Sequence, residues 1–289
     1  MEFVPALDVP VRRVALAPTF DDVPRHFAAD GDLILSHLAA ALSAVFPDGE
    51  DFFVRSVRHY RDQIDDPVLA AQVSGFIGQE ITHGREHRAF NTHLDTIGYH
   101  TKLVERIVRR VIGFRERHMP PLTNLAVTAA LEHVTATLAE IVLTDPEVQE
   151  SFGNDAVRHL FYWHALDESE HKAVAFDVYR AVGGGERLRI ATMKVSRYLF
   201  AISTAFQLAL SLLSDRATYR PGVLRASWRY ARRQPIFSRG VWRQLKEYER
   251  RGFHPSDRPN AELVVLWRER LFGSDGGMVA TLRGTALAS

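Results

Sequence analysis

Two segments of the sequence space glutamate and histidine so that they share one side of a helix. The stretch VSGFIGQEITHGREHRAFNTHL contains Glu80, His83 and His87, and the stretch YWHALDESEHKAVAFDVY contains His164, Glu168 and His171. At about 100° of turn per residue, the members of each trio point to the same side of their helix. The side of the first trio also carries apolar residues, namely Val73, Phe76 and Phe90. Carboxylate and imidazole groups on a core-facing side are typical of metal binding.

Two isolated glutamates interrupt helical stripes that are otherwise apolar. Glu50 is in phase with Phe53, Val57, Tyr60 and Ile64, and Glu132 is in phase with Leu125, Ala129, Ala136, Ala139 and Leu143. Four ionised carboxylates that converge in an apolar interior cost several kcal/mol each. Two divalent cations would cancel that charge. One Glu from each of two helices and one Glu-x-x-His from each of two others form the ligand set of di-iron and di-manganese helix bundles.

We therefore predict a dinuclear metal centre inside the protein. Its ligands from this reasoning are Glu50, Glu80, His83, Glu132, Glu168 and His171. The chain has no cysteine, which excludes disulfides, iron–sulfur clusters and thiolate zinc sites. Oxygen and nitrogen ligands favour two iron ions, with manganese or zinc as alternatives. A mononuclear site and a structural polar network are the other interpretations of the same residues.

The ligand order resembles that of a known class of oxygenases. Glu, Glu-x-x-His, Glu and His-x-x-x-Glu-x-x-His follow one another as in the di-iron N-oxygenases that convert aryl amines to nitro compounds. This resemblance, which is confined to the ligand pattern, implies that His164 is a seventh ligand. It also implies an O2-activating oxidoreductase that acts on a small organic substrate and takes electrons from a donor that the sequence does not identify.

Several residues near the predicted ligands are candidates for supporting roles. Phe53, Tyr60 and Phe76 are candidates for an apolar substrate wall or are plain core. His87 is either a proton relay or a hydrogen-bonded core histidine. Asp177 is a candidate for orienting a ligand imidazole, because carboxylates often do so beside metals.

A second resemblance covers most of the chain and suggests a different reaction. Residues 12 to 260 resemble the bacterial family of predicted metal-dependent hydrolases in four stretches, namely FPDGEDFFVRSVRHY, FIGQEITHGREHRAFN, LEHVTATLAE and WHALDESEHKAVAFDVY. The departure from that pattern is Asp167, which lies about 100° off the metal-facing side.

The hydrolase alternative also has a motif of its own. His83-x-x-Glu86-His87 fits H-x-x-E-H, in which two histidines bind zinc and the glutamate activates water. In this scheme Glu86 and His87 are the catalytic candidates. It leaves several buried acidic and imidazole groups without a role, and Glu86 points about 120° away from Glu80.

A non-enzymatic, ferritin-like metal-binding protein is the third interpretation. Such a protein would be a short chain that assembles into a shell. The roughly 100 residues after Gly185 argue against it, because they are better suited to cover a site or to bind a partner.

Helical periodicity dominates from about residue 30, so we predict an all-α, ferritin-like four-helix bundle core with additional C-terminal helices. We expect one helix to end at Pro47 and another to follow, capped by Asp48. Further helices are expected over 67–96, 102–118 and 123–143, and a last one is expected to contain residues 162–179 and to stop at Gly183. The domains would be an N-terminal extension (1–29), the bundle with the metal site (30–185) and a C-terminal helical region (186–289) packed on it, with a loose tail.

The region after the predicted bundle has an unusual charge distribution. Residues 198–214 are uncharged, and residues 216–251 contain ten Arg and one Lys against two Glu. We expect a buried helix followed by a charged helix with inward aromatics, with peripheral membrane contact or a homodimer through 198–251 as alternatives. The net charge of +1 gives no argument for nucleic acid. The N-terminus does not resemble a secretion signal, so a cytoplasmic location is expected, with membrane association as the alternative.

Overall fold

The computed structural model describes residues 8–283 and confirms the all-α class. No strand occurs among these residues, and one isolated bridge pairs Val14 with Leu282. The helices are α1 (Leu33–Arg58), α2 (Pro67–Thr96), α3 (Thr101–His118), α4 (Pro121–Thr144), α5 (Pro146–Glu150), α6 (Asp155–His171), α7 (Val174–Ala181), α8 (Glu186–Ser214), α9 (Val223–Ala231), α10 (Arg239–Glu247) and α11 (Ala261–Phe272). Short 3-10 helices are η1 (Ala17–Thr19), η2 (Ala29–Gly31), η3 (Arg61–Gln63), η4 (Arg216–Tyr219), η5 (Pro235–Phe237), η6 (Pro255–Asp257) and η7 (Val279–Thr281).

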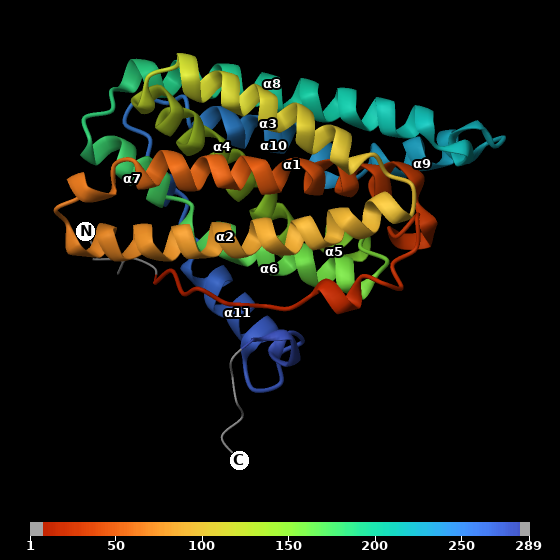
Figure 1. Cartoon of the computed structure of the whole chain (residues 1–289). Helices are drawn as coiled ribbons and strands as arrows, with labels where there is room; N and C mark the ends of the chain where they lie inside the picture. Colours follow the sequence, from red (N-terminus) through yellow and green to blue (C-terminus); the bar gives the residue numbers. More distant parts are fainter. Residues whose placement is uncertain (1–7, 284–289) are drawn as a thin grey trace.

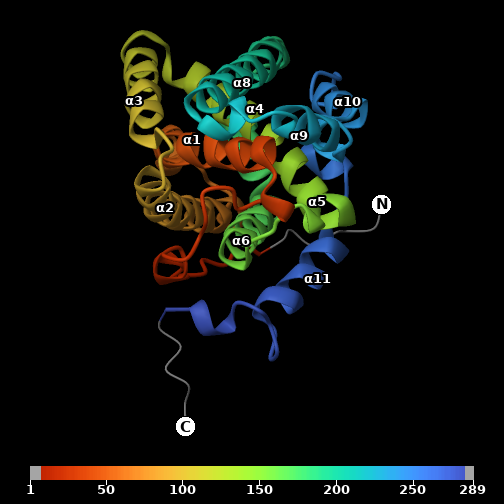
Figure 2. The ribbon, with the colours of Figure 1, turned by 90° about the vertical axis from the view of Figure 1, so that its right-hand side faces the viewer.

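Four of the helices enclose the interior (Figure 1). Helix α1 packs on α2 and α4, and α6 packs on the same two helices, so the four form a closed ring of contacts. Helices α3 and α8 cover α1 on one side, and α11 packs on α6 on the opposite side (Figures 1 and 2). All the predicted metal ligands lie on the four helices of the ring.

Helix α1 does not end at Pro47, which corrects the sequence-based expectation. It continues through Pro47 to Arg58 and carries Glu50 on its third turn from the end. Proline has no backbone N–H, so the carbonyl of Ser43 loses its usual partner four residues later. The side-chain amide of Asn91 donates to that carbonyl at 3.1 Å. A side chain from α2 therefore replaces the missing helical hydrogen bond, and the helix is kept.

Helix ends elsewhere follow ordinary capping chemistry. Asp66 accepts from the backbone N–H of Val68 at the start of α2, and Asn154 accepts from Ala156 at the start of α6. The last predicted helix is interrupted, because α6 ends at His171 and α7 begins at Val174. The side chain of Asn260 donates to the carbonyl of Ser169 at 2.7 Å, which satisfies one acceptor at that interruption.

Helix α8 is exposed rather than buried, which overturns another expectation. Its most apolar window is 11% buried, whereas that of α4, the other helix long and apolar enough to cross a membrane, is 61% buried. The aromatic residues that follow are divided. Trp228 and Tyr230 are exposed, Trp242 is half-buried, and Tyr248 is fully buried. The expected inward packing therefore holds for only part of this stretch.

The ends of the described chain meet on the outside of α6. The backbone N–H of Ala15 donates to the carbonyl of Thr281 at 2.8 Å, and Met278 is fully buried. The tail expected to be loose belongs in part to residues 284–289, which lie outside the described residues. The division into an extension, a bundle and a C-terminal region stays a prediction.

Candidate metal centre

The structure brings all seven predicted ligands together in the interior between α1, α2, α4 and α6. Their ligand atoms fall into overlapping groups in which all atoms lie within 4.8 Å of one another. The groups are Glu50–Glu80–His83, Glu80–Glu132–His171, His83–His164–Glu168 and Glu50–His87–His164. Every member of these groups is buried. The helical spacing and the two isolated glutamates therefore converge on one place.

Most of the ligand atoms at this place have no hydrogen-bond partner. The partnerless buried atoms are both carboxylate oxygens of Glu50, Glu80 and Glu132, Nδ1 of His83 and Nε2 of His171. Buried polar atoms almost always have a partner, because an unsatisfied one costs roughly 1–3 kcal/mol. The cluster contains eight such atoms, and all of them are carboxylate oxygens or imidazole nitrogens. These are ligand atoms that two divalent cations could bind.

The remaining nitrogen of each Glu-x-x-His imidazole is held by the opposite helix. Nε2 of His83 on α2 lies 3.2 Å from Asp167 Oδ2 on α6, and Nδ1 of His171 on α6 lies 2.7 Å from Gln79 Oε1 on α2. The Gln79 amide nitrogen donates to Glu170, so its oxygen must face His171. With a cation bound in the cluster, each imidazole would donate its only proton outward and present a lone pair inward, the arrangement of metal-binding histidines.

Asp167 therefore has a larger role than its position on the helix suggested. It lies off the metal-facing side of its own helix but reaches the imidazole of the neighbouring helix. Gln79 and Asp167 directly precede the two Glu-x-x-His glutamates, Glu80 and Glu168. A polar residue directly before each of these glutamates was a signal in the sequence. Only the packing of α2 against α6 shows that each such residue contacts the imidazole of the opposite helix.

Arg12, from the segment before α1, links the groups that hold the two imidazoles, namely Asp167 directly and Gln79 through Glu170. It donates to Asp167 at 2.7 Å and to both oxygens of Glu170 at 2.8 and 2.6 Å. Glu170 in turn accepts from Gln79 at 2.7 Å and from Arg268 at 2.6 Å. The carboxylates of Asp167 and Glu170 are fully buried, so Arg12 neutralises charges that water cannot reach. Sequence reasoning missed this arginine because it belongs to no motif.

Replacing Arg12 with glutamine is expected to weaken metal binding by about 10- to 100-fold, because the partners that orient both imidazoles lose their counter-charge. Competition between the protein and a chromogenic chelator measures this affinity. Arg13→Gln is the matched control, since Arg13 is exposed and forms no ion pair with the described residues. Arg12→Lys should recover part of the loss. Unchanged affinity in Arg12→Gln would remove the proposed orienting role.

A chain of hydrogen bonds fixes the tautomer of His164. The Asn91 side-chain nitrogen donates to two oxygens, so its oxygen accepts from the hydroxyl of Ser43 at 2.7 Å. Ser43 must then accept from Nδ1 of His87 at 2.9 Å. His87 has its Nε2 left to accept from Nδ1 of His164 at 2.8 Å.

This chain leaves Nε2 of His164 without a proton. Burial lowers the pKa of both His87 and His164, which keeps both rings neutral. The bare nitrogen of His164 faces Glu168 Oε1 at 3.1 Å and Glu50 Oε1 at 3.8 Å. A lone pair that faces two carboxylates is unfavourable unless a cation lies among them. His164 therefore presents a lone pair to the cluster and His87 orients its ring, while the role of His164 as a seventh ligand stays a prediction.

Glu86 is turned away from the cluster, so the structure does not support its predicted role as a water-activating base. Its Oε2 accepts from the backbone N–H of Leu16 at 2.9 Å, and its Oε1 accepts from Arg85 at 2.8 Å. Oε2 thus holds the N-terminal segment directly, and Arg85, which Oε1 contacts, donates to the carbonyl of Val14 in the same segment at 2.8 Å. Asp177 is also remote from any ligand imidazole, since it contacts His254 at 2.7 Å.

The electrostatics of the cluster favour bound cations. Burial, together with the neighbouring Glu80, raises the pKa of Glu50 well above its usual range. Burial, together with Glu168, raises the pKa of Glu132 to about 8. Without cations, these side chains would take up protons at neutral pH to avoid mutual repulsion. Divalent cations allow them to stay ionised.

An apolar cavity of about 100 Å³ reaches the cluster at His164 and Glu168. It runs between α1, α4 and α6, and most of its wall is apolar, including Leu38, Leu42, Phe46, Leu138, Ala139 and Phe161. The ring of Phe46 packs on both His87 and His164, at 4.9 and 4.6 Å between centroids.

The cavity wall differs from the one expected from the sequence. Phe53, Tyr60 and Phe76 do not line it. Phe53 and Phe76 belong to the core, and Phe76 contacts the ring of His171 edge-on. Helical periodicity identifies aromatic residues that face inward, but it does not predict on which side of the cluster a cavity lies.

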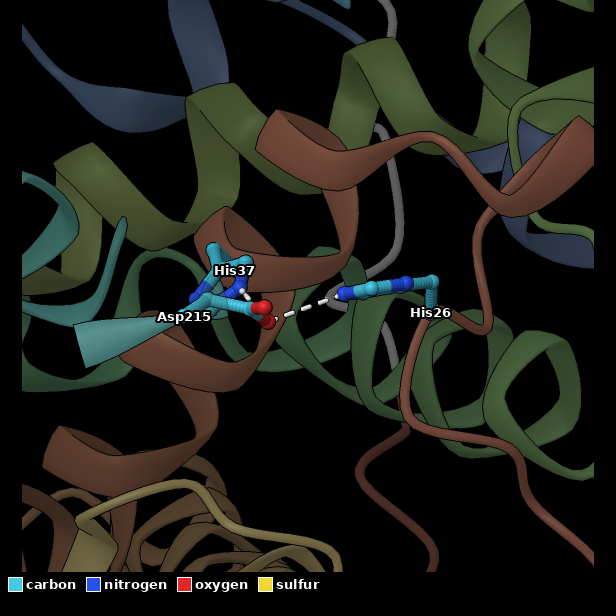
Figure 3. Close-up of side chains that lie close together, drawn as sticks. All are labelled: His26, His37 and Asp215. Carbon is cyan, nitrogen blue, oxygen red and sulfur yellow. Dashed lines mark hydrogen bonds and ion pairs between the residues drawn. The ribbon is translucent and has the colours of Figure 1, made fainter. Parts of the chain in front are cut away.

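A second group of His and Asp residues lies at the end of α8 (Figure 3). Oδ2 of Asp215 accepts from Arg25, His26 and His37 at 2.8, 2.9 and 3.0 Å, and its Oδ1 accepts from the backbone of Ala217. Burial lowers the pKa of His37 to about 4, so this ring is neutral. Because the Arg25 guanidinium already supplies the positive charge, this group is a satisfied ion-pair network rather than a metal site.

Comparison with known proteins adds one finding. No curated protein and no solved structure matches the chain. A family model described as predicted metal-dependent hydrolase matches residues 10–258, a range that includes Arg12 and every predicted ligand. The resemblance noted in the sequence is thus confirmed: the chain belongs to the family of predicted metal-dependent hydrolases.

Proposed function

We propose that this protein is a metal-dependent enzyme that uses a dinuclear centre to act on an apolar small molecule. The observation that supports this proposal is the cluster of eight partnerless ligand atoms, enclosed by four helices. Glu50, Glu80 and His83 would hold one cation, and Glu80, Glu132 and His171 would hold the other. His164, 3.8 Å from Glu50, would join the first set, and Glu168, 3.6 Å from His171, would join the second. Iron and manganese fit this set of oxygen and nitrogen donors, and zinc is the alternative.

The reaction that the geometry favours is oxidation of the substrate by O2. Bound iron ions would supply the electrons that reduce O2, with a reductase or small carrier restoring them. The apolar wall of the cavity would bind a hydrophobic substrate and exclude water from the cluster. The Asn91–Ser43–His87 chain would hold His164 in one tautomer beside that substrate.

Hydrolysis by a metal-activated water is the second candidate, and the family description favours it. Such a reaction needs a base beside the water and polar groups that stabilise a developing oxyanion. Glu86 is occupied by Leu16 and Arg85. Within the cavity wall, Thr135 and the ligands His164 and Glu168 are the polar groups nearest the centre, so a base would have to come from among the ligands or their partners.

The two reactions are separated by loading the purified protein with different metals. We expect the iron(II)-loaded protein to consume O2 and to change its absorption spectrum, and Glu168→Gln to lose both responses. We expect zinc-loaded protein to leave p-nitrophenyl acyl esters uncleaved. Ester cleavage by the zinc form that is lost in Glu168→Gln would establish the hydrolase instead.

Glu86→Gln provides a test of the H-x-x-E-H scheme. We expect it to keep the metal content and the O2 response, because Glu86 faces Leu16 rather than the cluster. Its cost should be a stability loss of about 1–2 kcal/mol from the weakened hydrogen bonds, measured by chemical denaturation. Loss of reactivity with unchanged metal content would restore Glu86 as a base.

A further inference from the structure

Helix α8 presents a continuous apolar stripe to solvent. The exposed residues of the stripe are Val195, Leu199, Ile202, Phe206, Leu210 and Leu213. Their spacing of three or four residues places them on one side of the helix. Ile202 and Phe206, at its centre, are 64% and 63% exposed. The opposite side of α8 packs on α1 and α4.

Neighbouring elements also expose apolar residues. Helix α3 lies on the same side of the bundle (Figures 1 and 2) and exposes its own stripe of Leu103, Ile107, Val111 and Phe114. Beyond the end of α8, the segment 219–228 exposes Tyr219, Leu224 and Trp228. We call these three sets together the α3–α8–α9 face. Large exposed apolar surfaces mark interaction sites.

The part of this face formed by η4 and α9 has a strong positive charge. Between Asp215 and Glu247 the sequence contains eight Arg and one Lys and no acidic residue. Six of these arginines, which lie beside the apolar residues of η4 and α9, are exposed: Arg216, Arg220, Arg225, Arg229, Arg232 and Arg233. None of the six forms an ion pair with any residue in the range 8–283. Their charge is therefore available to an external anionic partner.

We propose that the α3–α8–α9 face docks on an anionic lipid surface. Hydrocarbon accommodates the aliphatic stripe, and acidic headgroups complement the unpaired arginines, as in interfacial amphipathic helices. A second copy of this chain would bring the arginines of the two copies close together, which is repulsive. Nucleic acid would complement the arginines but leave the uncharged stripe of α8 in water.

The attachment is interfacial rather than membrane-spanning. One side of α8 packs against α1 and α4. Arg197, on that side, is buried and pairs with Glu249 at 2.7 Å. The Asp215 network fixes the end of α8 to α1 and to the N-terminal segment (Figure 3). The face is therefore held on the bundle in the conformation that would meet the lipid.

Co-sedimentation of the full-length protein with vesicles tests this proposal. Vesicles of phosphatidylcholine, alone or with about one third phosphatidylglycerol, separate the apolar from the anionic contribution. We expect binding to the anionic vesicles that weakens at high salt. Ile202→Gln combined with Phe206→Gln should reduce partitioning by about tenfold or more, because both side chains would enter the interface. Arg225→Glu combined with Arg229→Glu should reduce binding to anionic vesicles.

Val265→Gln is the matched control, because Val265 is 63% exposed on α11, on the opposite side of the bundle. Circular dichroism and metal content should remain unchanged in all these variants. Failure of the native protein to bind anionic vesicles would overturn the proposal, and so would equal binding by the α8 variant. A dimer in gel filtration that the α8 variant dissolves would identify a second copy as the occupant instead, and binding of an oligonucleotide in preference to vesicles would identify nucleic acid.

Discussion

Removing divalent cations from the purified protein with EDTA is expected to lower its thermal unfolding midpoint by about 10 °C. A ligand present at about a thousand times its dissociation constant stabilises the folded state by about 4 kcal/mol, and each kcal/mol shifts the midpoint of a chain of this size by about 2–4 °C. The physical source is the cluster of buried glutamates, which repel one another without cations. Elemental analysis of the untreated protein should give about two metal ions per chain, the number predicted from the ligand set.

This loss of stability should be greater at pH 8 than at pH 6. In the cation-free protein, folding raises the pKa of Glu132 to about 8 from its ordinary value of 4.5. The folded state then binds more protons than the unfolded state between these values, so its stability falls as pH rises through this window. Bound cations keep the glutamates ionised at both pH values. Scanning calorimetry of EDTA-treated and metal-loaded protein at the two pH values measures the difference, and a smaller gap at pH 8 would contradict this account.

Glu132→Gln should change the stability of the cation-free and the metal-loaded protein in opposite directions. Without cations, the substitution removes a buried carboxylate that forms no hydrogen bond and has only the His171 imidazole nearby, at 3.4 Å, so we expect a gain of about 2 kcal/mol at pH 8. With cations, it removes a ligand, so bound metal should fall from about two ions to about one per chain, and the stabilisation by metal should shrink. Chemical denaturation with and without EDTA, together with elemental analysis, gives both quantities.

The matched control is Glu140→Gln, two turns further along α4. Glu140 is half-buried and pairs with Arg258 at 2.7 Å, remote from the cluster. We expect this variant to lose at most about 1 kcal/mol, equally with and without cations, and to keep its full metal content. If Glu132→Gln destabilised the cation-free protein as well, Glu132 would be serving a purely structural network.

The proximity of the ligands could be predicted from the sequence, because helical periodicity determines which residues share a face. Glu50 and Glu132 were identifiable because each interrupts an apolar stripe, and a buried charge needs a compensating partner. The all-α class followed from the same periodicity.

The partners of the ligands were not identifiable, because they act across helices. Asp167 and Gln79 lie off the metal-facing sides of their own helices and become meaningful only when α2 packs on α6. Pro47 misled the helix assignment for a related reason, since its missing hydrogen bond is replaced by Asn91 from another helix. The exposure of α8 could not be predicted, because an apolar helix has the same composition in a core and on an interaction surface.

The two Glu-x-x-His imidazoles, His83 and His171, do not have equivalent supports, and this asymmetry should distinguish the two cations. His83 faces the carboxylate of Asp167, whereas His171 faces the neutral amide of Gln79. A carboxylate partner makes an imidazole the more basic ligand. The ion beside His83 should therefore be taken up first and released last, so that titration with metal would proceed in two unequal steps and a half-loaded protein would carry its ion at the α1–α2 end of the centre.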